Sequence, residues 1–315
     1  MKLSKEWMLG LFFLGLFIIM AIFVPGFIDP YNLTSMLYQL PELGILSLGM
    51  MVVVLTAGID LSITYLAALS GVVMAYALTA GLPVPVAMIA GVIAALIGGL
   101  LNGFFVAVIG VSPILVTLGT MTLFKGIILL ITKGNSVSGF PDSYSFIGNG
   151  DVLGIPFPMI LFAIVALLAW YLLNKTVWGR TVYMAGNNPI ATLFSGVNTK
   201  KVIMYVYLFS ALMAAIAAII MTSRYNSAKV DLGSSYQLQS IAVAVLGGTS
   251  ISGGYGKVIG VIFGTATFQV LSSGLNLLGV PGMVINILIG VVLLAVLLIN
   301  FFTAKYKHNQ LKKAA

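Results

Sequence analysis

Long apolar runs separated by short polar segments fill most of this chain. About ten of them approach the ~20 apolar residues that a transmembrane helix needs. They lie near residues 7–24, 43–57, 63–80, 84–109, 112–132, 157–173, 203–222, 239–251, 258–276 and 283–302. The second and eighth runs are short, which is typical of broken helices whose bare backbone is covered by protein or a cavity. The pattern predicts an all-α polytopic membrane protein of about ten transmembrane helices, some discontinuous; about eight spans with two re-entrant segments fit almost as well.

Basic residues are concentrated on one side of the expected membrane. With the N-terminus in the cytoplasm, 11 of the 15 lysines and arginines fall in cytoplasmic segments. These are Lys2, Lys5, Lys175, Arg180, Lys200, Lys201, Lys257, Lys305, Lys307, Lys312 and Lys313. Because cytoplasmic loops carry an excess of lysine and arginine, we expect both termini to be cytoplasmic. Residues 7–24 stay as the first span, since the run is longer than the apolar core of a signal peptide and no A-x-A-like cleavage site follows it.

Composition supports the membrane class and excludes several functions. The 315 residues are 60% hydrophobic and only 7% charged, whereas a soluble domain has roughly 25% charged residues. The net charge of +8 comes from lysines that flank spans, so we expect contact with the lipid bilayer and no nucleic-acid partner. The chain has no cysteine and one histidine, which argues against a metal site. No nucleophile–base set is present, so we expect no catalytic residues and no enzyme.

Residues 174–202 form a long basic interval between spans, and it contains no acid. Asn188 can cap a helix, Pro189 suits its first turn, and Gly196 suits its C-terminal stop. The sequence Gly186-Asn187-Asn188-Pro189 therefore predicts a short cytoplasmic helix over about 189–195. Its apolar face would be made of Ile190, Leu193 and Phe194. Such a helix is suited to pressing on a partner, while a solvated connector is the alternative.

Asp60 is, in this pattern, the only acid well inside the hydrophobic segments. It stands in Gly58-Ile59-Asp60-Leu61-Ser62, between two apolar runs with almost no loop. A charge inside a membrane is costly, so such a residue faces the interior of a bundle or a cavity. Gly58, Asp60 and Ser62 could mark a translocation path or a proton relay. Equally, Asp60 could cap the following helix, with Ser62 in its first turn.

The richest glycine cluster runs from Gly247 and Gly248 to Gly256. It is not a phosphate-binding loop, because Lys257 is followed by Val258 rather than by Ser or Thr. We therefore expect no nucleotide site in this chain and interpret the cluster as a break between two helices. The four-residue spacing of Gly256, Gly260 and Gly264 favours close packing between helices.

A few further polar residues interrupt the spans. Asn102, Gln269, Asn276 and Asn286 can each bond a neighbouring helix or face a polar pathway, and the first role is the commoner one. Outside the spans, residues 133–156 and 224–237 are the segments expected to meet something beyond the membrane, unless they are ordinary solvated loops.

Several of these motifs occur together in one known family. The chain resembles the membrane permease of ribose-type ABC importers, a group that also contains the autoinducer-2 permeases, from about residue 35 to residue 302. The resemblance rests on Gly58–Ser62, Pro113–Gly119, Gly179-Arg180, Gly186–Pro189, Ser195–Asn198 and Leu246–Gly256. Ile63-Thr64-Tyr65 stands where ribose-type members usually have a glycine, which leaves the sugar open.

The resemblance implies an inner-membrane permease subunit with no cofactor of its own. Two cytoplasmic ATPase subunits would bind ATP, a second permease subunit, identical or not, would complete the path, and an extracytoplasmic binding protein would deliver the solute. Residues 174–202 of the single 1–315 permease domain would then contact the ATPase, through Asn187, Asn188, Pro189, Ile190, Leu193, Phe194 and Gly196. The alternatives are an ion-coupled secondary transporter, where broken helices and an acid in the membrane also occur, and an ABC permease for a nucleoside or a branched-chain amino acid.

Overall fold

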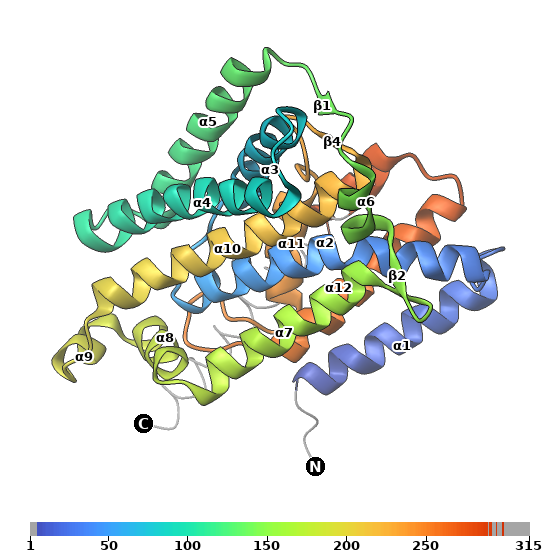
Figure 1. The fold of residues 1–315 in the computed structure, drawn as a ribbon. Helices are drawn as coiled ribbons and strands as arrows, with labels where there is room; N and C mark the ends of the chain where they lie inside the picture. The colour runs from blue at the N-terminus through green and yellow to red at the C-terminus, as the bar shows by residue number, and fades with distance from the viewer. Residues whose placement is uncertain (1–4, 289, 292–293, 295–297, 299–315) are drawn as a thin grey trace.

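The computed structural model describes residues 5–288, 290, 291, 294 and 298 of a bundle of helices (Figure 1). Nine helices match predicted spans. They are α1 (Lys5–Phe23), α2 (Pro30–Leu55), α3 (Ile63–Thr79), α4 (Val84–Gly103), α5 (Pro113–Thr132), α7 (Phe157–Lys175), α10 (Thr199–Tyr225), α11 (Tyr236–Leu246) and α12 (Val258–Leu277). Residues 282–288 are also helical, but half of the predicted span 283–302 lies outside the described residues.

The remaining elements are short. They are the π-helix Phe104–Ile109, which continues α4, then α6 (Asp142–Asn149), α8 (Val177–Asn187) and α9 (Pro189–Phe194). Strand β1 (Val137–Ser138) pairs antiparallel with β4 (Ser227–Ala228), and β2 (Asp151–Val152) pairs with β3 (Ile155–Pro156). Among the described residues, six helices are long and apolar enough to cross a membrane, which confirms the polytopic membrane class.

The prediction that the second span is short was wrong. Helix α2 has 26 residues and begins at Pro30, where the Asp29 side chain caps it by accepting the backbone N–H of Tyr31 at 2.8 Å. Its first half contains polar residues that hide it from an apolar pattern, and these residues have partners inside the bundle. Asn32, for example, accepts a 2.8 Å hydrogen bond from the Ser273 hydroxyl of α12.

The eighth span is short, as predicted. Helix α11 has only 11 residues and ends at Leu246, before the predicted limit of 251. Such a helix is about 16 Å long, roughly half of the hydrocarbon core. Gly247 and Gly248 follow it directly, and Gly248 has a φ of +88°, a conformation that glycine adopts at no steric cost. The glycine cluster is therefore the helix break that the sequence predicts.

Helix α2 forms the centre of the bundle. It contacts α10, α11, α12 and α7 and runs between α10 and α7 in Figure 1. In its most apolar stretch 78% of the residues are buried, against 28% in α5. The outer helices instead expose large apolar side chains such as Leu130 and Leu167. Burial in the centre and apolar exposure at the rim are what a helical bundle in lipid requires.

Helix α10 defines two ends of the bundle. Helix α9 lies near its first residue, Thr199, and α6 packs against its last turns (Figure 1). We call these the α9 end and the α6 end. At the α6 end, the Tyr144 hydroxyl lies 2.7 Å from that of Thr222. Burial raises the pKa of Tyr144 to about 12, so its hydroxyl stays neutral at physiological pH. The segment 133–156 is thus folded onto the bundle rather than freely solvated.

Glycines allow the closest helix approaches. A Cβ on Gly260 of α12 would fall 1.8 Å from the carbonyl oxygen of Gly247, and one on Gly99 would fall 2.5 Å from the Cβ of Ala211. Both distances are shorter than any van der Waals contact, so the helices approach as closely as the glycine spacing predicts.

Replacing Gly260 with alanine should destabilise the protein. The new methyl group must push α12 away from Gly247, and overpacking of this kind costs about 1–3 kcal/mol. The matched control is Gly119→Ala in α5, where a Cβ would meet nothing within 4 Å. The midpoint of thermal unfolding in detergent should fall for Gly260→Ala and stay unchanged or rise for Gly119→Ala. Equal midpoints would show that the backbone approach is not tight.

Candidate functional site

Asp60 lies in the connection between α2 and α3 and is 1% exposed. Its Oδ1 accepts the backbone N–H of Ser62 at 3.0 Å and the hydroxyl of Ser62 at 2.6 Å. Its Oδ2 accepts the hydroxyl of Ser210, from α10, at 2.8 Å. The carboxylate therefore closes a local turn at the start of α3 and ties that turn to α10. Ser62 is the N-cap residue of α3 and makes no side-chain cap of its own.

The same network extends into α4 and α5. The side-chain amide of Asn102 donates to the Ser62 hydroxyl at 2.8 Å, and its oxygen accepts from Thr120 at 2.7 Å. Asn102 is completely buried. Through Asp60, Ser62 and Asn102, these bonds join α3, α4, α5 and α10. Gly58 lies beside them, where a Cβ would come within 3.3 Å of the Tyr207 hydroxyl.

The prediction that Asp60 is the only acid inside the bundle was wrong. Glu42 is fully buried in α2, and its partner is Arg224, which the sequence had placed in an outer loop but which belongs to the last turn of α10. Nε and Nη2 of Arg224 donate to the two carboxylate oxygens at 2.6 and 3.2 Å. The Glu42 carboxylate also accepts the hydroxyl of Tyr236 at 2.8 Å and that of Tyr225 at 3.3 Å.

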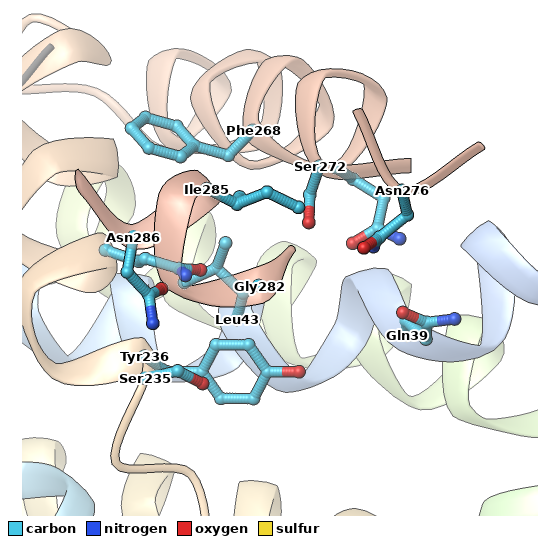
Figure 2. Close-up of a pocket in the computed structure, with 12 residues that line it drawn as sticks. Gln39, Leu43, Ser235, Tyr236, Phe268, Ser272, Asn276, Gly282, Ile285 and Asn286 are labelled. Atoms are coloured by element: carbon cyan, nitrogen blue, oxygen red, sulfur yellow. The ribbon is translucent and has the colours of Figure 1, made fainter. Parts of the chain in front are cut away.

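Beside this ion pair lies a pocket of about 240 Å³ between α2, α11, α12 and residues 282–286. Most of its polar lining consists of amides and hydroxyls: Gln39, Gln239, Gln269, Ser272, Asn276 and Asn286. Figure 2 shows Ser272 and Asn276 pointing from α12 toward Gln39, with the Tyr236 ring on the same side as Gln39. Asn276 and Asn286 are exposed, so the pocket is open to the surface of this chain.

The glycine cluster and α8 meet at the α9 end of the bundle. The backbone N–H of Gly254 donates to the carbonyl of Leu55, the last residue of α2, at 2.9 Å. A Cβ on Gly186 would lie 1.8 Å from the same carbonyl oxygen, and the Tyr183 hydroxyl donates to the carbonyl of Gly256 at 2.8 Å. Helix α8, which the sequence did not predict, therefore packs directly on the end of α2 and on the loop that joins α11 to α12.

The short helix predicted inside 174–202 is present as α9 (Pro189–Phe194). The Asn188 side chain caps it by accepting the backbone N–H of Ala191 at 3.0 Å, and Gly196 has a φ of +81°. Ile190, Leu193 and Phe194 are 69%, 57% and 87% exposed. Asn187 ends α8 immediately before the cap. The three apolar side chains thus share one uncovered face within this chain.

The residues singled out from the sequence fall into separate places. Gly58, Asp60, Ser62 and Asn102 form one buried network, whereas Gln269 and Asn276 line the pocket. Gly247 and Gly248 belong to neither group, because they form the helix break after α11. Glu42, Arg224, Tyr236 and the pocket amides Gln39 and Gln239 were missed. Glu42 alone carried a signal, because an acid so close to an apolar run needs a buried partner.

Comparison with known proteins gives the family. The family described as "Branched-chain amino acid transport system / permease component" matches residues 32–297. The ribose import permease protein RbsC of Bacillus subtilis is 39% identical over 293 residues, 91% of each chain. The RbsC protein of Escherichia coli K12 is 36% identical, over 94% of this chain and 95% of its own. The autoinducer 2 import system permease protein LsrD of Escherichia coli O9:H4 is 32% identical, over 94% and 92%. No solved structure is a significant match.

The chain is a bundle of apolar helices with internal polar networks, and the family model and the relatives match most of its length. Together these findings identify a component of a membrane transporter. The chain belongs to the family of branched-chain amino acid transport system permease components. Its resemblance to the permeases of ribose-type ABC importers is confirmed by the RbsC, D-allose and autoinducer 2 relatives.

Asp60→Asn should keep most of the stability and transport of the protein. The asparagine oxygen can still accept from Ser62, and the Ser210 hydroxyl can rotate to accept from the new amide. Asp60→Leu leaves buried donors without acceptors, at about 1–3 kcal/mol each. We expect a near-normal unfolding midpoint and solute uptake for Asp60→Asn, and a clear fall in the midpoint for Asp60→Leu. Loss of uptake by a stable Asp60→Asn protein would instead indicate proton handling by this carboxylate.

Proposed function

We propose that this chain is the permease subunit of an ABC importer for a small sugar or sugar-like solute, with a ribose-type pentose or autoinducer-2 as the candidates. The printed names of relatives that cover more than nine-tenths of the chain support this solute class. In this proposal the protein resides in the bacterial inner membrane and has no ATPase site. ATP is hydrolysed by two cassette subunits, a solute-binding protein delivers the solute, and a second permease subunit, identical or not, completes the path.

The proposed orientation places the α9 end in the cytoplasm, with about ten spans and both termini on that side. The support is the distribution of lysine and arginine, since Lys175, Arg180, Lys200 and Lys201 all lie next to α8 and α9. The α6 end, with the folded segment 133–156, would then face the solute-binding protein.

The observation that carries the ATP-driven mechanism is the uncovered apolar face of α9. Three large apolar side chains on a short, capped helix are a liability in water unless a partner covers them. In the proposed orientation, α9 lies outside the bilayer on the cytoplasmic side, where lipid tails cannot cover that face. A hydrophobic groove on the ATPase is therefore the proposed partner of Ile190, Leu193 and Phe194.

A mechanical connection from α9 into the membrane also supports this role. Helix α9 contacts α8, and α8 packs on the carbonyl of Leu55 and bonds to Gly256. Leu55 ends α2, while Gly256 lies in the loop that joins α11 to α12. A displacement of α9 by the ATPase would therefore reach α2, α11 and α12, which are the helices that line the pocket.

Leu193→Asp and Phe194→Asp should each disrupt coupling. A carboxylate placed in a dry protein contact loses its hydration without gaining a partner, so assembly weakens. We expect a large loss of ATPase copurification or of ATP-driven uptake, while the protein still inserts because no span is altered. Gly196→Val should act similarly, since a β-branched residue resists a φ of +81°.

The matched control for these variants is Ala191→Asp. Ala191 is exposed on α9 but lies outside the face formed by Ile190, Leu193 and Phe194. The Ala191→Asp protein should copurify with the ATPase as the unaltered protein does. Normal copurification and uptake in both Leu193→Asp and Phe194→Asp would remove α9 as the coupling element.

A further inference from the structure

We infer that the pocket between α2, α11 and α12 receives the transported solute, and that its chemistry selects uncharged polyhydroxy molecules over zwitterionic amino acids. This inference rests on the proposed import function and names the place and the solute class for it. The pocket volume of about 240 Å³ lies just below the ~300–1,000 Å³ typical of sites for drug-sized ligands, as a monosaccharide-sized solute requires.

The first support is a set of amides that have no partner. Across the described residues, no hydrogen bond is made by the side-chain amides of Gln239, Gln269 and Asn276. Gln269 is only 8% exposed, whereas Gln239 is half-buried and Asn276 is exposed, so these amides face the open pocket rather than another side chain. Each amide offers both donors and an acceptor. A sugar hydroxyl also donates and accepts, so the hydroxyls of a polyol can bond to these amides both as donors and as acceptors.

The second support is the charge of the lining. No lining residue within the described chain carries a charge. The carboxylate and ammonium groups of an amino acid would lose hydration here without gaining ionic partners, which is strongly unfavourable. Glu42 lies beside the pocket, but its carboxylate is already bound to Arg224, Tyr225 and Tyr236. The pocket therefore disfavours the amino-acid solutes that the family description names.

The third support is the way the pocket wall is held. Tyr236 lines the pocket, and its hydroxyl donates to the buried Glu42 carboxylate at 2.8 Å. This bond fixes the ring, which lies on the α2 side of the pocket in Figure 2, while Phe268 comes from α12. Two aromatic rings and a few oriented polar groups are typical of a small-molecule site. Glu42 and Arg224 act here as positioning residues, because they reach the pocket only through Tyr236.

The test uses the complete complex reconstituted in proteoliposomes with its ATPase and solute-binding protein. Uptake of ribose, allose, autoinducer-2 and leucine is measured first, and the best-imported compound becomes the probe. The double variant Gln269→Leu/Asn276→Leu should import it at least about tenfold more slowly, since two lost hydrogen bonds amount to roughly that factor or more. ATPase copurification should stay at the level of the unaltered complex, which shows that the variant still assembles. Asn135→Leu, an exposed amide outside the bundle, is the matched control.

A second measurement applies if the double variant fails to assemble. It uses single cysteines, which can be labelled selectively because the chain has no cysteine of its own. Asn276→Cys, labelled with a bulky methanethiosulfonate reagent, should lose import, whereas labelled Ser143→Cys on α6 should not. Normal import by the assembled double variant, or by labelled Asn276→Cys, overturns the assignment of the pocket while the import function stands. Import of leucine but of no sugar-like compound by the unaltered complex overturns the proposed function and the solute class together.

Discussion

The ion pair between Glu42 and Arg224 is the interaction on which the α6 end of the bundle depends. A buried carboxylate is costly unless it is paired and its remaining lone pairs are bonded. Arg224 supplies the charge, and two tyrosines supply further donors. The participants come from α2, α10 and α11, so the need to satisfy one carboxylate fixes three helices relative to one another. The same bonds set the position of Tyr236 at the pocket.

Two polar networks divide the interior into parts with different roles. The bonds of Asp60, Ser62 and Asn102 join α3 and α4 to α10 with every side chain paired. By contrast, the pocket between α2, α11 and α12 holds amides that are not paired within the described chain. Paired polar groups stabilise one arrangement, whereas unpaired groups are available to a passing solute. The glycine contacts at the α9 end then allow α8 to reach the helices of the pocket directly.

The sequence predicts those features that depend on neighbouring residues. Asn188, Pro189 and Gly196 define α9 because capping and turn geometry are local. The glycine cluster and the short α11 follow for the same reason. Helix α2 was wrongly shortened, because its polar first half is stabilised by partners in α10, α11 and α12. Glu42 and Arg224 are 182 residues apart, and no local pattern connects them. The pocket likewise needs residues from four segments, so only the folded chain shows it.

The most direct test of this account is the energy source of uptake by the reconstituted complex. Proteoliposomes that contain the permease, its ATPase and the solute-binding protein are loaded with ATP or with a non-hydrolysable analogue, and uptake of a labelled sugar is followed. The account predicts uptake that requires hydrolysable ATP and the binding protein and that is insensitive to a protonophore. Uptake driven by a proton or sodium gradient without ATP would contradict it, and would return Asp60 to the centre of a secondary-transport mechanism.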